Sequence, residues 1–115
     1  MPLIGVKVFG QFGGDLVAKN ENAFQAQLIK EIKSLLGPDC VVLKNDAGYK
    51  QGIPDLLILW HDKYAMLEVK KSASASHRPN QDYYIEKFGK YVFSSFVYPE
   101  NKEEVLNGIQ AAFGI

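Results

Sequence analysis

The sequence contains a single cysteine, no long apolar run and no excess of charge of either sign. Because Cys40 has no second cysteine to pair with, an internal disulfide and a zinc site built from several cysteines are both excluded. No apolar run approaches the length that spans a bilayer, so we expect no membrane partner and an intracellular, cytoplasmic protein. The 13 basic residues balance the 13 acidic ones, which argues against a large non-specific footprint on nucleic acid.

The length of 115 residues, with 47% hydrophobic residues, suits one compact domain, which we expect to cover residues 1–115. A helix is predicted over 20–36, where Leu28, Ile32 and Leu35 recur at helical spacing. The other patterns predict strands over 3–9, 40–43, 53–60, 64–70 and 91–98, and helices over 79–88 and 101–112. The order (β)αβββαβα indicates an α/β fold in which helices flank both sides of one mixed sheet.

Two apolar runs in the middle of the chain carry charged residues at their ends. Asp55 follows Pro54 at the start of the first run, and Glu68 and Lys70 end the second. The short polar link over 61–63 predicts that the two runs form an antiparallel hairpin. Charges at the ends of buried strands are costly to desolvate unless something compensates them, and a divalent cation is one such compensator.

Alternation along a strand puts Glu68 and Lys70 on one face, where Asp55 of the adjacent strand can approach them. The two carboxylates and the backbone carbonyl of Val69 would form an oxygen-only cage suited to Mg²⁺ or Mn²⁺. Lys70 is then placed to orient or deprotonate an attacking water. Each element alone has a simpler interpretation: Asp55 as a turn residue after proline, and Glu68 with Lys70 as a surface ion pair.

Together these residues resemble the PD-(D/E)xK nuclease superfamily, whose signature matches Pro54-Asp55 and Glu68-Val69-Lys70. The element order is similar to that superfamily's αβββαβ core, so the resemblance implies a restriction-endonuclease-like fold over roughly residues 20–98. The stretches 52–56 and 79–84 look like the VRR-NUC branch. That branch typically shows a Gly-x-Pro-Asp motif, a Glu-x-Lys motif and a glutamine opening the following helix.

The resemblance also implies roles for two residues outside the motif. Members of the superfamily often carry an acidic residue on the first helix that joins the metal site, and Glu21 fits this position because it continues the inward stripe of the helix. Gln81, in the first turn of the helix after the hairpin, is expected to bond a phosphate or the metal-bound water. The alternatives are a first-turn glutamate favoured by the helix dipole and an ordinary exposed glutamine.

Basic residues cluster around the motif and are candidates for contact with a phosphate backbone. These DNA-binding candidates are Lys44, Lys50, Lys71, His77 and Arg78. An ordinary solvated basic surface is compatible with the same pattern.

From these features we expect a DNA endonuclease that hydrolyses phosphodiester bonds with Mg²⁺ or Mn²⁺. The resemblance to stand-alone VRR-NUC proteins implies a phage or bacterial enzyme that cuts branched DNA, like a Holliday-junction resolvase, as a homodimer. A helicase or recombination protein would be a further partner. The alternatives are a nickase, homing or restriction-type endonuclease of the same superfamily, and a non-catalytic DNA-binding module that keeps the fold.

Overall fold

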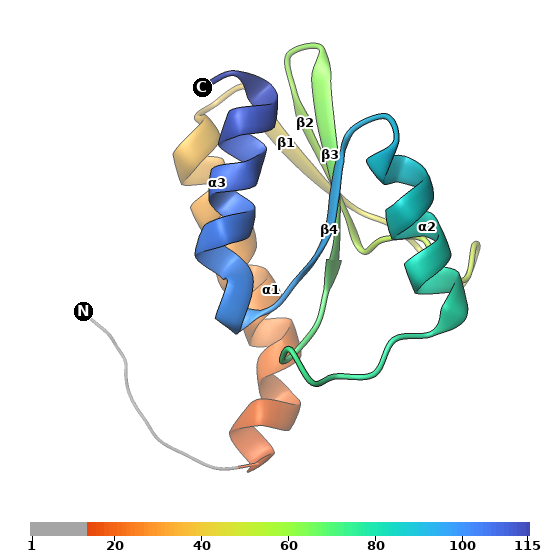
Figure 1. Ribbon diagram of the computed structural model, residues 1–115. Coiled ribbons are helices and arrows are strands. Elements are labelled where there is room, and N and C mark those ends of the chain that lie inside the picture. Colours follow the sequence, from red (N-terminus) through yellow and green to blue (C-terminus); the bar gives the residue numbers. More distant parts are fainter. Residues whose placement is uncertain (1–13) are drawn as a thin grey trace.

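The computed structural model describes residues 14–115, with side chains from Glu21 onward (Figure 1). In chain order its elements are α1 (Gly14–Leu36), β1 (Cys40–Lys44), β2 (Leu56–Trp60), β3 (Lys63–Val69), α2 (Pro79–Gly89), β4 (Phe93–Val97), the 3₁₀ turn η1 (Pro99–Asn101) and α3 (Lys102–Phe113). This order confirms the predicted αβββαβα arrangement, whereas the predicted strand over 3–9 lies outside the described residues. None of the helices in the described range is both long and apolar enough to cross a membrane.

The strands form one mixed sheet in the order β1-β2-β3-β4. β2 pairs antiparallel with both β1 and β3, so the predicted hairpin is confirmed. β4 runs parallel to β3, a pairing that needs a crossover connection, and α2 lies in that connection. β3 therefore has a strand on each side, and its residues from Ala65 to Val69 are all buried.

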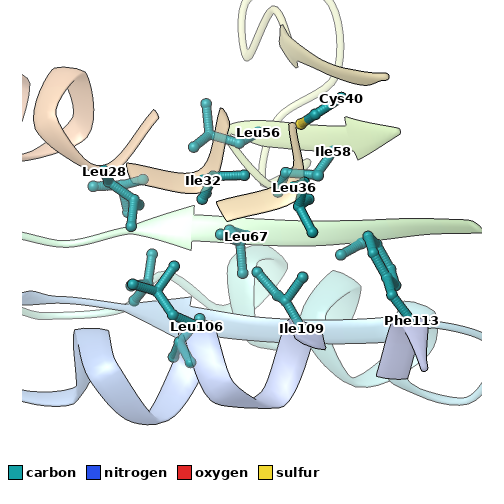
Figure 2. Close-up of a cluster of buried hydrophobic side chains, with 14 residues drawn as sticks. Leu28, Ile32, Leu36, Cys40, Leu56, Ile58, Leu67, Leu106, Ile109 and Phe113 are labelled. Atoms are coloured by element: carbon teal, nitrogen blue, oxygen red, sulfur yellow. The ribbon is translucent and has the colours of Figure 1, made fainter. Parts of the chain in front are cut away.

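Helices cover both faces of the sheet: α1 and α3 lie on one side and α2 lies on the other (Figure 1). The main core lies between the sheet and the two helices α1 and α3 (Figure 2). Its members include Leu28, Ile32 and Leu36 of α1, Cys40 of β1, Leu56 and Ile58 of β2, Leu67 of β3, and Leu106, Ile109 and Phe113 of α3. Burial of each large aliphatic side chain contributes about 2 kcal/mol to stability, and this layer fixes the sheet on which the charged residues stand.

Several details of the elements differ from the prediction. α1 begins at Gly14 rather than at residue 20, and β4 spans Phe93–Val97 rather than 91–98. The inward stripe of α1 ends at Leu36 rather than at Leu35, whose side chain is 38% exposed. The carbonyl of Leu36 also accepts a hydrogen bond from Nε1 of Trp60 at 3.0 Å, which ties the end of α1 to β2. β2 begins at Leu56 and not at residue 53, because Pro54 has no N–H to donate to a neighbouring strand.

Candidate active site

The acidic residues of the motif lie on the face of the sheet that α2 covers. Leu67 and Val69 of β3 belong to the core on the α1 and α3 side, so strand alternation turns Glu68 toward α2. In the same way, Leu56 at the start of β2 points into the core, and Asp55 just before it points to the α2 side. The predicted convergence of the two carboxylates follows from this shared face.

Asp55 is held from two sides, by Val69 at the end of β3 and by Asn45, which directly follows β1. Its Oδ2 accepts a hydrogen bond from the N–H of Val69 at 2.9 Å. Its carbonyl accepts one from the N–H of Asn45 at 2.8 Å, and Nδ2 of Asn45 donates to the carbonyl of Pro54 at 2.8 Å. These bonds hold the carboxylate of Asp55 beside Glu68, the residue before Val69.

Gln81 links Glu68 to Lys70. Its Nε2 donates to Oε2 of Glu68 at 2.9 Å, and its Oε1 accepts from Nζ of Lys70 at 2.8 Å. The carbonyl of Ser76 accepts a second bond from Nζ of Lys70 at 3.0 Å, and the N–H of Arg78 donates to Oε1 of Gln81 at 3.0 Å. The amide orientation of Gln81 is thereby defined at both ends, because only its oxygen can accept from Lys70.

Glu68 is 4% exposed, and its Oε1 is buried with no hydrogen-bond partner among the described residues. Burial, followed by the nearby charge of Asp55, raises the pKa of Glu68 from 4.5 to about 8, although Lys70 acts in the opposite direction. A buried carboxylate oxygen without a donor requires either a proton or a cation. Two adjacent carboxylates form an oxygen donor set of the kind that hard divalent cations prefer.

Two further metal ligands were predicted beside the acidic pair, Glu21 and the carbonyl of Val69. Glu21 is exposed on α1, and the side chains that the structure describes, from Glu21 to Ile115, include no group of three acidic, histidine or cysteine residues placed to hold a metal ion. The structure therefore does not support the role assigned to Glu21. Val69 meets Asp55 through its N–H, and the use of its carbonyl as a ligand stays a prediction.

The predicted DNA-binding residues divide into two groups. Lys44 pairs with Leu56, whose side chain lies in the core, so Lys44 points to the face opposite Asp55. Lys50, Lys71 and Arg78 are exposed in segments next to the site, and Nζ of Lys50 lies 5.9 Å from the ring centre of Tyr84 on α2.

His77 lies against β4 rather than free in the loop. Its ring stacks on Phe96 with 3.8 Å between the ring centres, and its Nδ1 lies 3.0 Å from Oδ1 of Asp82. Phe96 is the partner of Glu68 in the parallel pairing of β3 and β4. His77 thus sits over the same face as the acidic pair, one strand away.

Asn45 and Ser76 help to position the site and were not predicted. Asn45 orients the chain at Pro54 and Asp55, and Ser76 contributes only a carbonyl oxygen to Lys70. The sequence carries no local signal for either contact, because both are made by loop residues to partners several positions away.

Two solved structures have this arrangement of helices and strands. A structure described as a VRR_NUC domain superposes with a TM-score of 0.63 and 24% identity, covering 76% of this chain and 95% of the other. A second, described as a VRR_NUC domain protein, gives a TM-score of 0.61 and 19% identity over 83% of this chain and 88% of the other. The chain has the VRR_NUC fold. The resemblance read from the motifs is thereby confirmed for the fold, with its mixed α/β core. No protein-family model matches the sequence, and no curated protein is significantly similar to it.

Proposed function

We propose that this chain is a nuclease that hydrolyses phosphodiester bonds in DNA, with Mg²⁺ or Mn²⁺ held by Asp55 and Glu68. The observation that carries the proposal is Oε1 of Glu68, which is buried beside Asp55 without a hydrogen-bond partner among the described residues, with Lys70 joined to Glu68 through Gln81. The VRR_NUC fold of the chain supports the same activity.

The donor set fits Mg²⁺ without a third acidic residue. Mg²⁺ is commonly bound by one or two carboxylates, and its other positions are filled by waters and substrate phosphate oxygens. The carbonyl of Val69 would add a third protein oxygen. Without Glu21 the proposed site has one protein ligand fewer. Asp55, Glu68 and the carbonyl of Val69 would still be enough to hold Mg²⁺, with waters and phosphate oxygens in the other positions.

A bound divalent cation would supply Lewis-acid activation of water and neutralise charge on the phosphate. Lys70, whose Nζ is held by Gln81 and Ser76, would stabilise the negative charge that develops on the phosphate oxygens. Gln81 would keep the carboxylate of Glu68 and the ammonium of Lys70 in fixed orientation. Asp55 would be held in its ligating position by the N–H of Val69.

We propose branched DNA, such as a four-way junction, as the substrate. The exposed cations near the site, Lys50, Lys71 and Arg78, would contact phosphates, which position a substrate without reading its sequence. A two-fold homodimer would present two such sites to the paired strands of a junction. Light scattering of the purified protein would test this dimer directly.

The test is a cleavage assay on a four-way junction, a flapped duplex and a linear duplex of the same sequence, each with Mg²⁺ or EDTA. We expect Mg²⁺-dependent cleavage that is fastest on the junction and is lost in Asp55→Ala. Asp62→Ala, which removes an exposed carboxylate at the hairpin turn, is the matched control and should cleave normally.

Other outcomes would assign a different activity. Cleavage of the linear duplex at one fixed sequence would favour a restriction-type, homing or nicking enzyme over the junction-cutting one. Binding of DNA without cleavage under any metal condition would favour a non-catalytic module and would overturn the proposal.

A further inference from the structure

A cleft of about 600 Å³ lies beside the acidic pair, between the loop that joins β1 to β2 and the start of α2. Ala47, Gln51 and Gly52 line one side of it, and Arg78, Asn80 and Gln81 line the other. In Figure 1 the loop is yellow and the start of α2 is green. None of the proposed metal ligands lines this cleft, so it is a separate feature of the molecule.

The cleft keeps its shape because the loop touches α2 directly. Gly52 has φ of +85°, and a Cβ atom at this position would lie 2.3 Å from Cβ of Asn80, so only glycine permits the contact. Within the same loop, Oδ1 of Asp46 accepts the N–H of Gly48 at 2.8 Å, and the carbonyl of Asp46 accepts the N–H of Tyr49 at 3.1 Å, so the loop side of the cleft is also held by its own turn. The opening thus has two defined sides.

The chemistry of the lining suits a nucleotide. Gln51 and Asn80 present carboxamide groups, which can donate to and accept from the edges of bases, whereas the carboxamide of Gln81 is bonded to Glu68 and Lys70. Arg78 adds a cation that can bind a phosphate or stack on a base. The described residues that line the cleft include no acidic side chain that would repel a phosphate.

Gln81 connects the cleft to the proposed catalytic site, since its Nε2 donates to Oε2 of Glu68. We infer that the cleft holds an unpaired nucleotide of the DNA strand that is cut, immediately next to the scissile phosphate. The inference rests on the proposed nuclease function for its role, and it narrows the substrate to DNA with unpaired nucleotides at the cut. A fully stacked base in a duplex could not enter a lateral cleft without being unpaired first.

Binding can be tested without catalysis, by NMR titration of the protein with the single-stranded trinucleotide d(TTT) in EDTA. We expect shifts confined to the side-chain amides of Gln51, Asn80 and Gln81 and the nearby backbone. Ala47→Leu places a larger side chain at the exposed edge of the cleft and should abolish these shifts. Asn80→Ala, which removes a carboxamide from the lining, should weaken these shifts. Asn107→Ala, which removes an exposed carboxamide on α3, is its control and should leave them unchanged. Unperturbed signals from the core would show that each variant is folded.

A cleavage assay is the second experiment. It compares a fully paired junction with one of the same sequence that has two unpaired nucleotides at the cut. We expect the wild-type protein to cut the junction with unpaired nucleotides about tenfold faster, because no base has to be unpaired and unstacked before it enters the cleft. Ala47→Leu should remove this preference and leave the rate on the fully paired junction unchanged.

The possible failures are distinguishable. If d(TTT) causes no shifts at the cleft, or if the shifts persist in Ala47→Leu, the cleft inference is overturned, whatever the cleavage results. If the protein cuts both junctions at the same rate, the inference is overturned and the nuclease proposal stands. If d(TTT) binds in the cleft but no DNA is cut, the nuclease proposal fails while nucleotide binding is retained.

Discussion

Glu68 is the one charged side chain that is buried in the part of the chain described by the structure. Its pKa is 4.5 when unfolded and about 8 when folded, because burial and then the charge of Asp55 favour the neutral acid. The folded protein therefore binds a proton more tightly than the unfolded chain does. Its contribution to stability is fully present below pH 4.5 and is lost as the pH rises through 8.

In EDTA we therefore expect the free energy of unfolding to fall between pH 5 and pH 8, by on the order of 3 kcal/mol. Glu68→Gln is neutral at all pH values and should lack this decrease, so it should be more stable than the wild-type protein at pH 8. Urea unfolding of both proteins at pH 5, 6.5 and 8 measures the difference. Parallel stability curves for the two proteins would show that Glu68 does not have the assigned pKa.

The burial of Glu68 beside Asp55 also predicts that a divalent metal stabilises the folded protein. At pH 8, Mg²⁺ should stabilise the wild-type protein by about 2.7 kcal/mol when its concentration is 100 times the dissociation constant. The reason is that the cation satisfies the two carboxylates only in the folded state. Thermal unfolding with and without Mg²⁺ measures this, with KCl of equal ionic strength as the control. An equal shift in Asp55→Ala would place the bound metal elsewhere.

At the scale of elements, the close packing of α3 on β4 depends on Gly108. A Cβ atom at Gly108 would lie 2.4 Å from Cε1 of Phe93, so the ring of Phe93 occupies the space of a side chain. We expect Gly108→Ala to destabilise the protein by about 1–3 kcal/mol, because the clash outweighs the better helix propensity of alanine. Gly89→Ala is the matched control, since a Cβ there meets nothing within 4 Å. Chemical denaturation of both variants is the measurement, and equal stabilities would contradict the packing argument.

The elements themselves were largely predictable from local patterns. The hairpin, α2 and α3 could be predicted because the hydrophobic residues of each recur at a single spacing, of a strand or of a helix, between clear turn signals. The end of the α1 stripe was not, since Leu35 and Leu36 both lie within a helical turn of Ile32. Tertiary packing decides between them, because the side chain of Leu36 lies in the core between the sheet, α1 and α3.

Asp55, Glu68 and Lys70 were predicted to converge because strand alternation and the hairpin fix their shared face. Gln81 was expected at the site only through the resemblance, and the structure shows that it bonds Glu68 and Lys70. Glu21 illustrates what periodicity leaves open. A helical stripe gives the direction of a side chain around the axis, but Glu21 stands seven residues before Leu28, or about 10 Å along the helix. The sequence contains no information on how far that end of the helix lies from the sheet.

At the scale of the whole molecule, the net charge of zero limits how strongly DNA can be bound through phosphates. If Lys50, Lys71 and Arg78 are the phosphate contacts, the logarithm of the DNA affinity should fall with the logarithm of salt concentration with a slope of about −3. Lys71→Ala should reduce this slope by about one. Lys44→Ala, on the opposite face of the sheet, should leave it unchanged. Fluorescence anisotropy titrations in EDTA at several salt concentrations measure the slope, and equal effects of the two substitutions would contradict the assigned DNA-binding face.

The central claim is that Asp55 and Glu68 hold a divalent cation for phosphodiester hydrolysis. Single-turnover cleavage of a four-way junction at pH 8, with Mg²⁺ titrated against wild-type protein and Glu68→Gln, tests it most directly. We predict cleavage by the wild-type protein that requires Mg²⁺ or Mn²⁺, and a rate at least about 100-fold lower for Glu68→Gln at saturating metal. Cleavage in EDTA, or a wild-type rate for Glu68→Gln, would contradict it.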